Sequence, residues 1–169
     1  MYETDLDNDT SLTSDVLIYN ALIKAAKDNP LLKIFKIDYP SENALAEESN
    51  TIFVASVDDE ITKQTMNAEF YNALTEIFVK TKKTNYKEAS MVLRTVIKVI
   101  KKVLREDESL GMYKPVFRKS ASNYGSKFAL KGRNVLVQTK ERDLFDVKDI
   151  EIEKVCEILI KNDEEGAGE

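Results

Sequence analysis

The segment Asn85–Arg105 constrains the fold more than any other part of the chain. At about 100° per residue, its apolar side chains fill one half of a helical wheel. Asn85 or Thr84 can cap its start, and Glu88 suits its first turn. Six cations form one stripe on the opposite half: Lys87, Arg94, Lys98, Lys101, Lys102 and Arg105. The pattern therefore predicts a long surface helix that packs on a core through one face only.

Runs of β-branched and aromatic residues on both sides of this helix predict a sheet. Glu69–Lys82 alternates with a period of two and predicts a long strand with most of both faces buried. Asp58-Asp59-Glu60 begins a polar connection, and Lys131–Asn134 supplies a hairpin turn. The other expected strands are Leu31–Asp38, Thr51–Val57, and two or three antiparallel strands within Met112–Ala121 and Gly125–Arg142.

A helix is also expected at each end of the chain. Ser14-Asp15 offers a cap for the first, which Pro30 stops. A short amphipathic helix follows Asp149, with Ile152, Val155, Cys156 and Leu159 on one face. The fold class is thus α+β, a mostly antiparallel sheet packed against a long amphipathic helix with N-terminal and C-terminal helices. Residues 1–13 are expected to be a flexible acidic N-terminus, 14–161 a single domain, and 162–169 a disordered acidic tail.

Composition argues against most enzyme classes. The 169 residues include no histidine, the commonest general base and metal ligand, and one cysteine, too few for a thiolate zinc site. The acidic first residues are unlike a signal peptide, and no apolar run approaches the ~20 residues that cross a bilayer. We therefore expect a soluble protein, made in a reducing cytosol, with no membrane partner.

The remaining candidates for chemistry are weak. Asp5–Asp9 opens like a calcium loop, but its sixth and twelfth positions are Thr10 and Val16 instead of glycine and glutamate. Asp58-Asp59-Glu60 has no second ligand group, which is typical of a solvated turn. Cys156 lies among carboxylates and on an apolar helical face, so we interpret it as a buried structural cysteine. No catalytic residue, metal or cofactor is therefore expected.

Charge is divided into three blocks along the chain. Residues 1–79 carry −10, residues 80–142 carry +12 and residues 143–169 carry −7. Two interpretations stay open: the blocks pair within the fold or between copies, or the basic surface meets an anion such as DNA phosphate. Four aromatic residues near the cations lack the spacing of an RNA-recognition sheet, and core packing explains them equally well: Tyr86, Tyr113, Phe117 and Tyr124.

The order of these elements resembles the tail terminator (tail completion) proteins of long-tailed phages and related archaeal viruses. The similarity lies in the opening helix, the sheet, the helix that crosses it and a later hairpin: Asp15–Lys27, Thr51–Val57 with Glu69–Lys82, Tyr86–Arg105 and Tyr124–Thr139. The resemblance implies a non-enzymatic ring, usually a hexamer, that ends the tail tube and joins it to the head.

The same resemblance implies the partners and the location. They are further copies of the chain, the tail tube protein, the head–tail connector or stopper protein, and DNA that passes through the ring with transient, non-specific contact. The protein would be made in the host cytoplasm and end in the neck of the virion. The alternatives are another neck or head–tail connector protein, a small nucleic-acid-binding module that uses the basic stripe, and a small enzyme with a carboxylate site.

Overall fold

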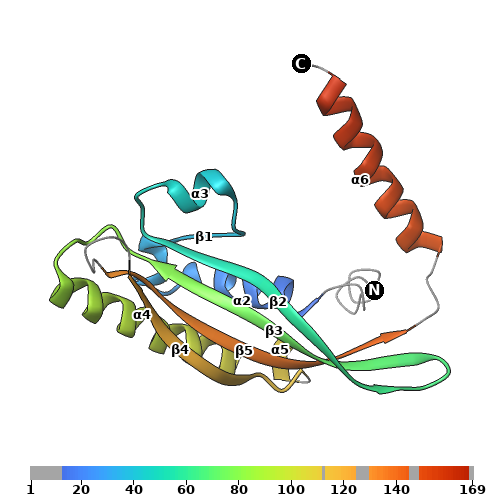
Figure 1. The fold of residues 1–169 in the computed structure, drawn as a ribbon, viewed down its shortest axis with the longest axis horizontal. Coiled ribbons are helices and arrows are strands. Elements are labelled where there is room, and N and C mark those ends of the chain that lie inside the picture. Colours follow the sequence, from blue (N-terminus) through green and yellow to red (C-terminus); the bar gives the residue numbers. More distant parts are fainter. Residues whose placement is uncertain (1–12, 112, 125–129, 145–148, 168–169) are drawn as a thin grey trace.

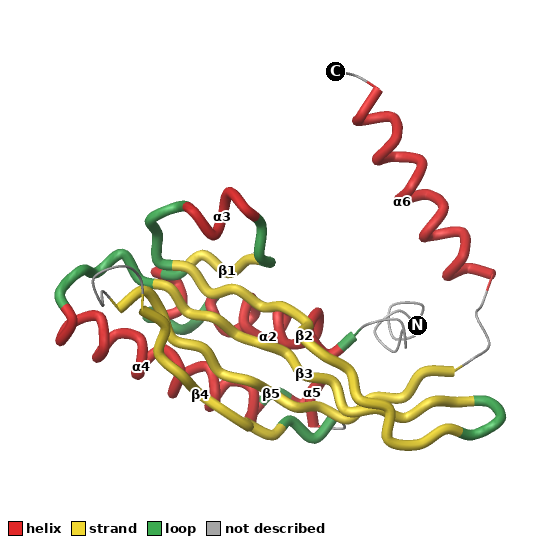
Figure 2. The backbone as a smooth tube through the Cα atoms, viewed as in Figure 1, coloured by secondary structure: helices red, strands yellow, loops and turns green. Residues whose placement is uncertain are grey.

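The computed structural model describes residues 13–111, 113–124, 130–144 and 149–167. Its strands are β1 (Lys36–Asp38), β2 (Thr51–Gln64), β3 (Ala68–Lys80), β4 (Val116–Tyr124) and β5 (Leu130–Leu144). Its helices are α2 (Ser14–Ala26), α3 (Glu42–Ala46), α4 (Tyr86–Glu106), α5 (Glu108–Gly111) and α6 (Asp149–Ala167), with a 3-10 turn, η1 (Leu32–Ile34). The α+β class predicted from the sequence is confirmed (Figure 2).

The five strands form one mixed sheet in the order β1-β2-β3-β5-β4. Strand β3 lies at its centre and pairs antiparallel with both β2 and β5 along its whole length. Its side chains alternate between fully and partly buried, as the period of two predicts. Only β1 runs parallel to its neighbour, and it covers no more of β2 than Thr51 to Phe53.

Helices α2 and α4 cover one face of this sheet and form the core with it (Figure 1). Leu93, Ile100 and Leu104 of α4 are buried, as are Ile77 and Val79 of β3. Each such side chain contributes about 1.5–3 kcal/mol through removal of its surface from water. The Asn85 side chain accepts a hydrogen bond from the Glu88 backbone N–H at 3.2 Å, so the predicted cap is confirmed.

Among the described residues, the opposite face of the sheet is covered only near β1. There the Phe53 and Phe78 rings stack with centroids 6.4 Å apart. The Lys80 ammonium lies 5.8 Å from the Phe53 ring and donates hydrogen bonds to carbonyls at the end of α3, including that of Leu45 at 3.1 Å. No described helix packs on the rest of this face (Figure 1).

The β2–β3 hairpin continues well past the two helices as an arm (Figure 1). Asp58-Asp59-Glu60, predicted to begin a polar connection, instead belongs to β2, which runs on to Gln64. Register shifts between Ser56 and Asp58 and between Ile61 and Lys63 each leave one β2 residue without a partner, and pairing with β3 resumes after each. Met66 at the tip is 95% exposed.

Two further predictions of local structure are wrong. In Leu31–Asp38 only the last three residues form a strand, because the Asn29 side chain accepts hydrogen bonds from the backbone N–H groups of Leu31 and Leu32 and favours the turn of η1. The predicted turn at Lys131–Asn134 lies inside β5, where Gly132 pairs with both Lys80 and Asn123.

The C-terminal helix is longer than predicted. Helix α6 begins at Asp149 and continues to Ala167, into the segment 162–169 that was expected to be a disordered tail. Cys156 is exposed, so its interpretation as a buried structural residue is wrong. The expected flexible N-terminus lies outside the described residues, except for Thr13, which precedes α2.

Candidate functional site

The predicted basic stripe occupies the outer face of α4. Lys87, Arg94, Lys98, Lys102 and Arg105 are exposed, and Lys101 is half-buried. Their positions are fixed by the buried residues on the other side of the helix, such as Val96 and Ile97. A helix that buries one face so completely has no freedom to rotate the stripe inward. The structure therefore presents all six predicted cations on one surface of the molecule.

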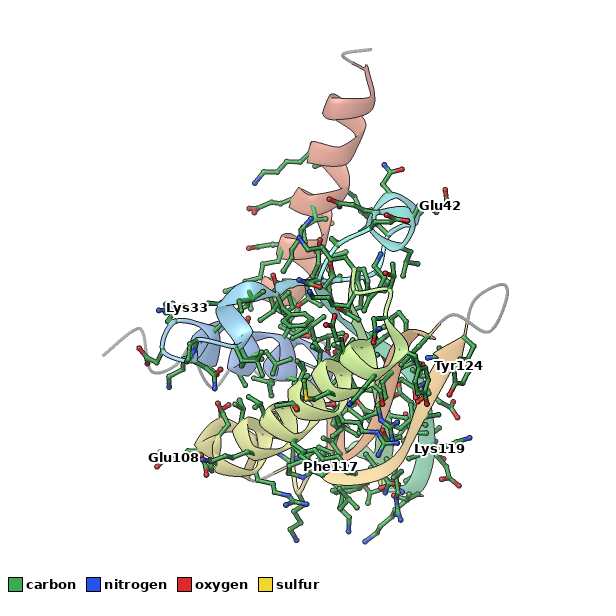
Figure 3. All side chains as sticks on the ribbon, turned by 90° about the vertical axis from the view of Figure 1, so that its left-hand side faces the viewer. Lys33, Glu42, Glu108, Phe117, Lys119 and Tyr124 are labelled. Atoms are coloured by element: carbon green, nitrogen blue, oxygen red, sulfur yellow. The ribbon has the colours of Figure 1, made fainter. Side chains whose placement is uncertain are left out.

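Phe117 of β4 orders the C-terminal end of this stripe. The Lys101 ammonium lies 5.6 Å and the Arg105 guanidinium 5.3 Å from the centroid of its ring. Cations at this distance from an aromatic face gain about 0.5–1 kcal/mol where they are exposed. Figure 3 shows Phe117, Lys119 and Tyr124 following β4 beside α4. The sequence placed Phe117 near the cations, and the structure shows that it contacts two of them.

The stripe is not neutralised by acids of the described chain. The two ion pairs among the described residues join Lys36 to Asp38 at 3.4 Å and Lys83 to Glu88 at 3.8 Å, and neither includes a cation of the stripe. Lys119 of β4 is also exposed, but it pairs with Leu136 and therefore points to the face of the sheet away from α4. Because like charges repel, a basic surface of this kind is stabilised by an anionic partner.

Acidic side chains lie along β2, which is toward the opposite edge of the sheet from β4. Because β1 pairs with β2 only as far as Phe53, the rest of β2 forms a free edge among the described strands. Asp58, Asp59 and Glu60 lie on it and line a shallow pocket with Asn72 and Gln138. Burial, followed by repulsion from Glu141 and Asp58, raises the pKa of Asp59 above its ordinary value. The acidic edge thus holds more negative charge than its surroundings offset.

A polar cluster that the sequence did not reveal joins α2 to β5. The Ser14 hydroxyl lies 2.7 Å from that of Thr139, and the Ser14 backbone N–H donates to Glu141 at 2.5 Å. Burial and a hydrogen bond with Glu141 raise the pKa of Tyr71, and burial also raises the pKa of Tyr113 beside the same carboxylate. Since Glu141 satisfies the free N–H at a helix start, the cluster fits a structural anchor for α2.

The other sequence candidates lie apart from these surfaces. Asp5–Asp9 lies outside the described residues. No group of three or more histidine, cysteine, aspartate or glutamate side chains could hold a metal ion within the described parts of the chain. None of the described helices combines the length and the apolar character that crossing a membrane requires.

Comparison with known proteins gives no further assignment. No protein-family model matches the sequence, and no curated protein is similar to it. The functional argument therefore depends on the two charged surfaces, which are the six-cation stripe and the acidic edge of β2.

Proposed function

We propose that the protein is a structural subunit that assembles with copies of itself into a ring at the head–tail interface of a virion. One observation supports the proposal: the basic stripe beside β4 and the acidic edge of β2 lie toward opposite edges of the same sheet. The two surfaces are complementary in charge but different in structure. A contact between them joins unlike surfaces of two copies.

Such a heterologous contact repeats from copy to copy and closes into a ring when the rotation between subunits allows it. Charge pairing across the contact would favour the correct orientation and suppress other ones. Strands β2 and β4 also carry backbone groups along their free outer edges, and these edges tend to pair with another strand. Both features favour self-assembly over a monomer.

The ring is proposed to act without catalysis, as the resemblance of the layout to tail terminators implies. It would end the polymerisation of the tail tube protein and bind the head–tail connector, in six copies around the path of the DNA. Cations of the stripe that remain free in the ring would contact passing phosphates weakly and without sequence preference. The virion would be its final location.

A nucleic-acid-binding module is the second candidate, because the six cations of the stripe form one basic surface and none of them is in an ion pair with a described acid. In that case the cations would bind phosphate directly and the protein would act as a small species. Affinity for DNA would then fall steeply as salt increases, since each phosphate contact releases a counterion.

Native mass spectrometry, electron microscopy and DNA filter binding at several salt concentrations test the two candidates. Rings of several 19.2 kDa copies with weak DNA binding are expected. A monomer or dimer with tight, strongly salt-dependent DNA binding would contradict the ring and favour the second candidate. Adding a tail tube protein to purified rings tests the finer assignment, because a terminator stops tube growth.

A further inference from the structure

Helix α6 exposes more apolar surface than any other described helix. Six of its large apolar side chains are 51 to 59% exposed: Ile150, Ile152, Val155, Ile158, Leu159 and Ile160. Ile152, Val155 and Leu159 recur at helical spacing and lie on one side with the exposed Cys156. We call this side, Ile152, Val155, Cys156 and Leu159, the apolar side of α6. It is a continuous apolar strip of the kind that packs against a second surface.

No described element supplies that second surface within the same chain. Helix α6 has no extended packing with the sheet or with another described helix, and it rises away from α4 in the views of both ribbon figures (Figures 1 and 3). In proteins most helical stability comes from tertiary packing of an apolar face and not from helix propensity. A partner that covers the apolar side would therefore stabilise α6.

The charges of α6 indicate which surface that partner offers. Glu151 and Glu153 border the apolar side, one on each flank. The stripe of α4 offers cations one turn apart, such as Lys98 and Lys102. Between its cations the stripe also holds Met91, which is 65% exposed. The surface beside α4 thus combines positive charge with accessible apolar atoms, which is complementary to α6.

We propose that α6 of one copy docks along the basic stripe of α4 in a second copy. The apolar side of α6 would cover Met91 and the aliphatic stems of the lysines, while Glu151 and Glu153 pair with the stripe cations. The inference deepens the proposed function and rests on it for one point only, that the contact repeats around a ring. It assigns part of the stripe to the C-terminal helix, which would share the basic surface of the neighbouring copy with the acidic edge of β2.

The first test measures mass in solution. Val155→Asp with Leu159→Asp is expected to convert the assembly into single 19.2 kDa copies at micromolar concentration. The fold should survive, because α6 has no extended packing within the chain. Ile150→Asp is the matched control, since Ile150 is equally exposed but lies on the other side of α6, and it should leave the mass unchanged. An unchanged mass in the double variant, or an equal loss in the control, would overturn the proposal.

A charge exchange tests which surface receives α6. Lys98→Glu with Lys102→Glu is expected to weaken assembly at least tenfold. Adding Glu151→Lys with Glu153→Lys to the same chain should restore it, because opposite charges then face each other again. Failure of this rescue would overturn docking on α4.

These outcomes separate the inference from the proposed function. Rings that survive every α6 variant would contradict the inference and leave the ring intact. A reciprocal dimer that dissociates in the α6 variants would support the docking and contradict the ring. A wild-type monomer at high concentration would contradict both.

Discussion

Gly132 lies where the sheet has no room for a side chain. A Cβ added at this position would lie 2.5 Å from Cζ of Phe78 and 2.6 Å from the backbone oxygen of Val79. Ordinary carbon contacts lie at about 3.5–4.0 Å. The Phe78 ring is stacked on Phe53, and the Val79 carbonyl belongs to the central strand. Neither atom can move without displacing β3 or its neighbours.

We therefore expect Gly132→Ala to destabilise the fold. Overpacking of this kind costs about 1–3 kcal/mol. The reduced freedom of the unfolded chain returns about 0.4–1 kcal/mol. A net loss of about 1–2 kcal/mol lowers Tm by about 2–8 °C in a chain of this length. Thermal and urea unfolding, followed by circular dichroism, measure the loss.

Two matched variants make the result decisive. Gly111→Ala should be neutral or slightly stabilising, because no atom lies within 4 Å of its added Cβ and its φ is not positive. Phe78→Leu should reduce the additional cost of Gly132→Ala, since it removes the ring from the crowded space. If Gly132→Ala proves as stable as Gly111→Ala, the close approach of Phe78 and Val79 described above would be refuted.

Three further predictions address charge, core and assembly. Asp59→Asn should raise Tm at neutral pH and lose this gain at acidic pH. The pKa of Asp59 is raised in the folded protein, so the ionised carboxylate lowers the stability of the fold as pH rises through that pKa. Thermal unfolding of both proteins across a range of pH measures the difference. Leu93→Ala should cost about 2–5 kcal/mol in urea unfolding, whereas Met91→Ala should cost little because Met91 is largely exposed. Met91→Cys treated with a short bis-maleimide should give covalent multimers through the natural Cys156, visible on denaturing gels; multimers that persist in Cys156→Ser would contradict this pairing.

The helix α4 could be predicted from the sequence because one strong periodic signal governs it. Its apolar half, its stripe and its Asn85 cap agree with one another, and the structure follows all three. The alternation in Glu69–Lys82 is equally clear, and strand β3 appears at the centre of the sheet. Local pattern and tertiary environment favour the same structure at both places.

The predictions failed at residues whose type suggests a local turn or loop but whose contacts are with residues distant in the sequence. Gly132 and Asn134 read as turn residues, yet Gly132 leaves space for Phe78, and the Asn134 side chain accepts a hydrogen bond from the Ala121 backbone N–H at 3.0 Å. Asp58-Asp59-Glu60 reads as a loop, but pairing with β3 extends the strand through it. The charged stripe was visible in the sequence, whereas the acidic edge was not, because it depends on where β1 ends.

The arm of the β2–β3 hairpin also divides the molecule into regions that open at different rates. Its strands pair with each other apart from two register shifts, but every β2 residue from Ser56 to Gln64 is exposed. Backbone amides there depend on pairing alone, whereas those near Ile77 are also protected by two helices. Amide exchange with deuterium should therefore spread inward from Met66, with the strand centres beneath α4 exchanging last and only on global unfolding.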